Sequence, residues 1–79
     1  RSVICRTNYG LLLLRLGRVE EGCKQMEAVL PPAEVRYNVA SMLELQNRKA
    51  EARIEFEKAL KLDPNLQDAR KRLAQLNSD

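Results

Sequence analysis

The sequence has 79 residues, enough for one small domain, and 44% of them are hydrophobic and 32% charged. A disordered tail would be poorer in apolar residues, so we expect this chain to fold. The leucine run Leu11–Leu14 is far shorter than the roughly 20 apolar residues that cross a membrane, which excludes a transmembrane helix. Because Arg1 is not a start methionine, we also expect the chain to be a piece of a longer protein.

The side chains argue against catalysis. Histidine, the commonest metal ligand and a frequent general base, is absent. Two cysteines cannot form a zinc site without other ligands, and 14 basic residues against 11 acidic ones is too small an excess to indicate nucleic-acid binding. We therefore expect no enzyme activity, no cofactor, no metal, no nucleic-acid partner and no membrane insertion, while the compartment stays undetermined.

The composition, with three glycines and three prolines, favours helices, and the apolar spacing predicts five of them. The first runs over 3–16 and is ended by Gly17, since glycine readily adopts the left-handed conformation that closes a helix. The second runs over 19–30 and is ended by Pro31-Pro32, because proline cannot continue the helical ladder. The expected apolar positions of these two helices are Val3, Ile4, Tyr9, Leu12, Leu13 and Leu16, then Val19, Gly22, Cys23, Met26, Val29 and Leu30.

The third expected helix runs over 33–46, with Asn47 as a left-handed cap, and the fourth runs over 48–62. Asp63-Pro64-Asn65 signals a turn, after which we expect a fifth helix over 66–76 with Asn65 as its N-terminal cap. The charged side of the fourth helix, which includes Glu55, is interpreted as a solvated face. The expected apolar positions are Val35, Val39, Met42, Leu43 and Leu45, then Ala52, Phe56, Ala59, Leu60 and Leu62, then Leu66, Ala69, Leu73 and Leu76.

The first two expected helices align with the next two at an offset of 30 residues. Asn8-Tyr9-Gly10 aligns with Asn38-Val39-Ala40, and Gly22 aligns with Ala52. A small residue thus recurs in both helices of each pair, which would allow the two helices to approach closely. A helix–turn–helix unit that is used twice is typical of a helical-repeat array.

Counted from Ala33, the second unit resembles a tetratricopeptide repeat, whose period is 34 residues. Both units depart from that family at position 4, where Arg6 and Arg36 stand in place of a large apolar residue. The residues that carry the resemblance are the small side chains Ala40, Ala52 and Ala59 at positions 8, 20 and 27, Phe56 at position 24 and Pro64 at position 32.

The resemblance implies an all-α fold, in which antiparallel helix pairs stack as a right-handed superhelical α-solenoid with five helices in total. It divides a single domain, 1–79, into a first repeat over about 3–32, a second over about 33–66 and a capping helix over about 66–77. In such a unit Cys5 and Cys23 would be too far apart for a disulfide, and both are expected to be small buried residues.

Arrays of this family resemble binding scaffolds rather than enzymes, and the first helix of each pair lines a concave groove. The resemblance therefore implies a protein–protein interaction module that binds a peptide or a partner helix in that groove. Carried over position by position, the expected groove residues are Thr7, Asn8, Leu11, Leu14, Arg15, Glu34, Tyr37, Asn38, Ser41, Leu45 and Arg72.

Asn8 and Asn38 occupy the same position in successive units. A side-chain amide has one acceptor and two donors, so this pair could hold the main chain of an extended peptide, with Leu11, Tyr37 and Leu45 selecting its sequence. Alternatively, each amide could bond to a neighbouring helix.

Several alternatives stay open at this point. Leu11, Leu14 and Leu45 could instead pack against a neighbouring repeat or a second copy. Some family members hold a C-terminal carboxylate, but of the five residues that this needs only Asn38 and Arg72 are present. The alternative function is a structural segment that extends or dimerises a larger helical assembly without a ligand of its own, so self-association is left open.

Overall fold

The computed structural model describes residues 3–78, with the side chains of Val3 and Ile4 outside the described part. These residues form helices and turns and no strand, as the sequence predicts. The five helices are α1 (Val3–Arg15), α2 (Val19–Glu27), α3 (Pro32–Leu45), α4 (Lys49–Leu62) and α5 (Gln67–Ser78).

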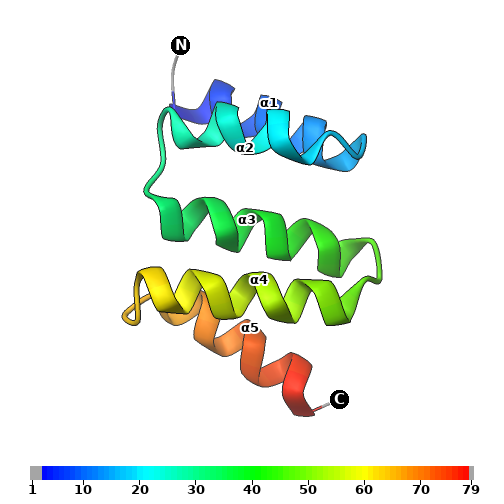
Figure 1. Ribbon diagram of the computed structural model, residues 1–79, viewed down its shortest axis with the longest axis vertical. Helices are drawn as coiled ribbons and strands as arrows, with labels where there is room; N and C mark the ends of the chain where they lie inside the picture. The colour runs from blue at the N-terminus through cyan, green and yellow to red at the C-terminus, as the bar shows by residue number, and fades with distance from the viewer. Residues whose placement is uncertain (1–2, 79) are drawn as a thin grey trace.

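The helices form two antiparallel pairs followed by a single helix (Figure 1). α1 packs chiefly on α2, α3 packs chiefly on α4, and α5 packs on α4. α3 also contacts both helices of the first pair, which joins the two pairs into one body of 38 × 26 × 16 Å. The all-helical fold and the predicted order of five helices are therefore confirmed.

The turns inside the two pairs have the same construction. Gly17 and Asn47 have positive φ angles of 84° and 63°, and each stands just past the end of a helix. The backbone N–H of Arg18 then bonds to the carbonyl oxygen of Leu13 at 2.8 Å, and the N–H of Arg48 bonds to Leu43 at 2.9 Å. A left-handed residue closes a helix in this way because it brings the N–H group of the next residue back to an unpaired carbonyl group in the last turn of the helix. Both predicted left-handed residues are confirmed.

Several predicted helix boundaries differ from the structure by one to three residues, and two of these differences lie at the prolines. α2 ends at Glu27, three residues before the expected end. The residues after it form a turn, and Leu30, which directly precedes Pro31, is disfavoured from the helical conformation. α3 begins at Pro32 rather than at Ala33, since proline fits the first turn of a helix, where its missing N–H has no partner to lose.

The turn before α5 is closed by a different residue from the one expected. The carboxylate of Asp63 accepts a hydrogen bond from the backbone N–H of Asn65 at 3.0 Å, and the carbonyl oxygen of Asp63 accepts one from Leu66. Asp63 is therefore the residue that organises this turn, as aspartate commonly does two residues before the N–H it binds.

Each helix pair is held at a contact between small residues. A side-chain carbon added at Gly22 would lie 2.6 Å from the carbonyl oxygen of Gly10, and one added at Gly10 would lie 2.7 Å from Met26. The equivalent residues in the second pair, Ala40 and Ala52, are fully buried in one cluster. The predicted close approach at small residues is present in both pairs.

Two clusters of buried side chains form the core. One joins the two pairs, and the other joins the second pair to α5. They contain Leu14, Cys23, Met26, Val35 and Val39 in the first, and Ala40, Ala52, Phe56, Ala59, Ala69 and Leu76 in the second.

Several apolar residues that were expected to face inward are exposed. Tyr9 and Leu12 of α1 are 52% and 45% exposed, and Leu16, which follows the last residue of α1, is 62% exposed. Leu45 and Leu62 are exposed as well. Cys5 is exposed rather than buried, Cys23 is buried as expected, and no disulfide joins them.

We expect Ala52→Leu to lower the free energy of unfolding by about 1–3 kcal/mol, because the larger side chain must push α4 away from α3. Ala50→Leu is the matched control, since Ala50 lies on the same helix and is exposed. Urea unfolding followed by circular dichroism measures both variants. Equal midpoints for the two would contradict this account of the helix contact.

Candidate functional site

The predicted groove residues lie on α1, α3 and α5, which are the first helices of successive units. Asn8, Leu11 and Arg15 follow one another at spacings of three and four residues, so they share one side of α1. Asn38, Ser41 and Leu45 occupy the equivalent row on α3. The side chains of these rows are exposed or half-buried, and Leu45, at 78% exposed, is the most exposed large apolar side chain of residues 5–78.

One predicted groove residue lies inside the protein. Leu14 is 3% exposed and belongs to the cluster that joins the two helix pairs, with Leu11 packed against it. Its side chain meets α2 and α3 because the small residue at position 22 lets α2 come close. Leu14 therefore has a core position and offers no surface to a ligand.

The Arg72 side chain is engaged in an ion pair within the chain. Its guanidinium Nη2 and Nε donate to Oε1 of Glu44 at 2.5 and 3.1 Å, and its charged carbon lies 5.9 Å from the centre of the Phe56 ring. Tyr37 packs on the same ring at a centroid distance of 5.7 Å. The pKa of Arg72 is raised, first of all by its hydrogen bond to Glu44. This cluster fastens α5 to the second pair, so a ligand carboxylate at Arg72 would have to displace Glu44.

The two predicted amide side chains have different surroundings. Asn8 is exposed, whereas Asn38 is half-buried and donates to the sulfur of Met26 at 3.5 Å. A thioether is a weak acceptor, so this contact holds Asn38 only loosely. The hydroxyl oxygens of Thr7 and Ser41 are buried and have no hydrogen-bond partner among the described residues.

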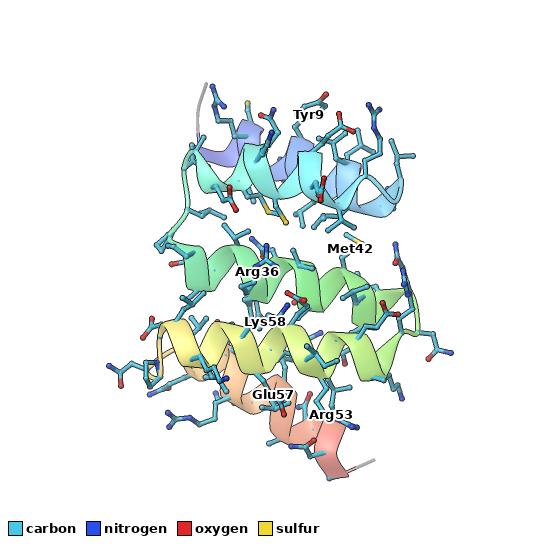
Figure 2. All side chains as sticks on the ribbon, viewed as in Figure 1. Tyr9, Arg36, Met42, Arg53, Glu57 and Lys58 are labelled. Carbon is cyan, nitrogen blue, oxygen red and sulfur yellow. The ribbon has the colours of Figure 1, made fainter. Side chains whose placement is uncertain are left out.

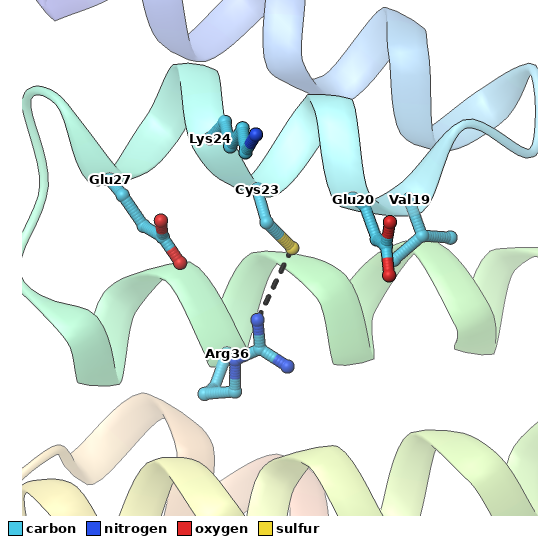
Figure 3. A pocket seen from close by; sticks show the side chains of 6 residues that line it. All are labelled: Val19, Glu20, Cys23, Lys24, Glu27 and Arg36. Atoms are coloured by element: carbon cyan, nitrogen blue, oxygen red, sulfur yellow. Dashed lines mark hydrogen bonds between the residues drawn. The ribbon is translucent and has the colours of Figure 1, made fainter.

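A second surface feature, which sequence reasoning missed, is a pocket of about 460 Å³ between α2 and α3 (Figure 3). At its floor the Arg36 guanidinium donates to the sulfur of Cys23 at 3.2 Å and to Glu55 of α4 at 2.9 Å. Its wall carries charges of both signs, Glu20, Lys24 and Glu27. Arg36 thereby links three helices, which explains how a charged residue replaces the usual apolar one at this position.

The residues of this pocket are structural rather than reactive. Burial raises the pKa of the Cys23 thiol, and the nearby Arg36 charge only partly offsets that effect. A buried thiol of raised pKa stays protonated at neutral pH and is a poor nucleophile. Glu55, expected on a solvated face, has a side chain only 14% exposed and also bonds to Lys58. Its pairing with Arg36 spans 19 positions and follows from helix packing, which no local sequence signal reveals.

The described residues contain no group of three or more His, Cys, Asp or Glu side chains that could hold a metal ion. Within the same part of the chain, no helix has both the length and the apolar character that crossing a bilayer requires.

Comparison with known proteins identifies the second unit. Residues 33–66 match the family model described as Tetratricopeptide repeat, a span that covers α3, α4 and the turn before α5. No curated protein and no solved structure matches the chain. This family consists in general of non-enzymatic protein-interaction modules.

We expect Arg36→Ala to lower the free energy of unfolding by about 1–3 kcal/mol, because it leaves Glu55 largely buried and without one of its charged partners. Arg48→Ala is the control, since the Arg48–Glu51 pair has side chains 52% and 53% exposed and should contribute about 0–1 kcal/mol. Urea midpoints of both variants provide the comparison. A midpoint for Arg36→Ala no lower than that for Arg48→Ala would show that Arg36 does not link the helices in solution.

Proposed function

Because residues 33–66 match the tetratricopeptide-repeat family model, we propose that the face formed by α1, α3 and α5 binds a peptide or a partner helix. The family as a whole supports a protein-interaction role, and the position of the binding face is our proposal. The observation that carries it is the exposure of Leu45, a large apolar side chain that is 78% accessible within a row of polar groups.

The two rows of this face offer complementary contacts. α1 and α3 run in the same direction, because each is antiparallel to α2, and each row begins with an asparagine. Asn8 is exposed and Asn38 is held only by a thioether, so both amides can turn to the C=O and N–H groups of an extended chain. Main-chain contacts of this kind support binding without demanding a particular ligand sequence.

Ligand selection would come from the side chains between and beyond these amides. Leu11 and Tyr37 are half-buried and Leu45 is exposed, which favours a ligand with apolar side chains at intervals. Arg15 and Glu34, both exposed, add one charge of each sign. Arg72 is paired with Glu44, which disfavours recognition of a terminal carboxylate at this position.

The alternative function is a structural segment of a larger helical assembly. It is supported by a separate observation, the exposed apolar side chains of Tyr9 and Leu12 on another side of α1 and of Leu16 just past its end. The two roles use different sides of the same helix, so they do not exclude one another.

The test is a selection from a random peptide display library on the immobilised chain, followed by affinity measurement for the peptides obtained. We expect Leu45→Asp to weaken binding at least about tenfold, because an apolar contact becomes a buried charge. Asn38→Ala should weaken binding as well while leaving the fold intact, since a bond to sulfur is all that it removes from the protein. Ile54→Asp is the matched control, because Ile54 is a 52% exposed apolar residue on α4.

Circular dichroism of each variant separates loss of binding from loss of folding. The opposite pattern would contradict the proposal. If the chain keeps its affinity for the peptides with Leu45→Asp and Asn38→Ala together but loses it with Ile54→Asp, the binding face lies on the other side of the molecule.

A further inference from the structure

Arg15 presents a charge on the proposed binding face with which no other described side chain pairs. It is the last residue of α1, it is exposed, and α1 contains no acidic residue. Among residues 5–78, the Arg15 side chain forms no hydrogen bond or ion pair. Most arginines of this part of the chain donate to a partner instead, namely Arg18, Arg36, Arg48, Arg53, Arg70 and Arg72.

Stacked units leave this position of a first helix open. At the repeat offset of 30 residues, Arg15 corresponds to Leu45 of α3. α3 has a neighbour on each side: Met42 lies between it and the first pair (Figure 2), and the Arg72–Glu44 pair joins it to α5. Leu45 is nevertheless 78% exposed. By the same geometry, a unit stacked ahead of α1 would meet another side of that helix and leave Arg15 open.

Arg15 and Leu45 lie beside each other on neighbouring helices. α1 and α3 run in the same direction and are in contact, and the axes of packed helices are about 8–10 Å apart. Both residues stand seven positions after the asparagine of their row, which is about 10 Å further along the helix. An apolar side chain and a positive charge thus stand side by side, two turns beyond the amides of Asn8 and Asn38. We call Leu45 and Arg15 the Leu45–Arg15 subsite.

An extended peptide that crosses from α3 to α1 matches the spacing of this subsite. In such a peptide, side chains two positions apart point to the same side and stand about 7 Å apart. When Asn38 and Asn8 hold the main chain, the side chains on one edge of the peptide point along the helices toward Leu45 and Arg15. The long, flexible side chain of Arg15 covers the remaining difference in distance.

Building on the proposed function, we propose that the Leu45–Arg15 subsite selects an extended peptide in which an Asp or Glu stands two positions from an apolar residue. The apolar side chain packs on Leu45. The carboxylate accepts from the Arg15 guanidinium, and such a charge-assisted hydrogen bond is stronger than a neutral one. A lysine or arginine at the same position of the peptide is repelled, because α1 has no carboxylate to offset the charge of Arg15.

The described chain does not itself supply such a segment, so a second copy is the poorer occupant. Asp63 is the one acidic residue of 3–78 that lies outside the helices. The residues two positions from it are Lys61 and Asn65, and both are polar. The carboxylate of Asp63 also accepts a hydrogen bond from the backbone N–H of Asn65. A partner peptide of the stated pattern therefore fits the subsite better than a second copy does.

The test compares the peptides that three forms of the complete chain select from one random display library. The unaltered chain should select Asp or Glu two positions from an apolar residue, and Arg15→Glu should select Lys or Arg at that position instead. Arg6→Glu is the matched control, because Arg6 lies nine positions earlier on α1 and therefore half a turn away from Arg15. It should select the same peptides as the unaltered chain. Circular dichroism checks that both variants are folded.

The affinity of one selected peptide measures the contact itself. Replacing its acidic residue by the corresponding amide should weaken binding to the unaltered chain about fivefold, as expected for an exposed charge pair. The same replacement should have no effect on binding to the Arg15→Ala chain, because the partner of the carboxylate is then absent. The fivefold difference should also shrink at high salt, since ions screen exposed charges.

Several results would overturn the proposal. If the unaltered chain and Arg15→Glu select the same charge while Leu45→Asp still abolishes binding, the subsite is wrong and the proposed function stands. An amide replacement that weakens binding equally in the Arg15→Ala chain would mean that the carboxylate meets another group. If no selected peptide depends on Leu45, the proposed function fails as well. A chain that sediments as a dimer and becomes a monomer with Leu45→Asp would make a second copy the occupant.

Discussion

The structure depends on how closely the two helices of each pair approach. At Gly10 and Gly22 the backbones come so near that a side-chain carbon at position 22 would lie 2.6 Å from a carbonyl oxygen. Alanine fills the equivalent places in the second pair, where both methyl groups are fully buried. With no room for a larger residue, each pair has one close arrangement. The outward directions of the side chains on α1 and α3 follow from it.

In this arrangement the different sides of each first helix have different roles. One side of each first helix packs on its partner, and a second side packs on the neighbouring unit through Leu14, Val35 and Val39. The sides that remain carry the asparagine rows and, on α1, the exposed side chains of Tyr9 and Leu12. Arg72 pairs with Glu44 and fixes α5 to the second pair. Arg36 pairs with Glu55 inside the second pair and bonds to Cys23 of the first pair.

Much of this organisation could be predicted from sequence, because helix spacing, turn residues and small-residue contacts are local or periodic signals. Gly17, Asn47 and the alanines of the second unit are examples. The side of α1 that faces the core could not be predicted from sequence. The run Leu11–Leu14 places an apolar group on every side of a helix, so the periodicity selects no face. Leu14 is consequently buried, and Leu12 is exposed. Pairs such as Arg72–Glu44, 28 positions apart, exist only once the helices are packed.

The central claim, that close backbone contact sets the geometry of each pair, is tested most directly by proton distances in solution. Nuclear Overhauser measurements on the labelled chain should give strong cross-peaks between the Hα protons of Gly10 and Gly22, and between the methyl groups of Ala40 and Ala52. Chemical shifts that report intact helices, together with the absence of both sets of cross-peaks, would contradict the account, because the helices would then pair through other faces.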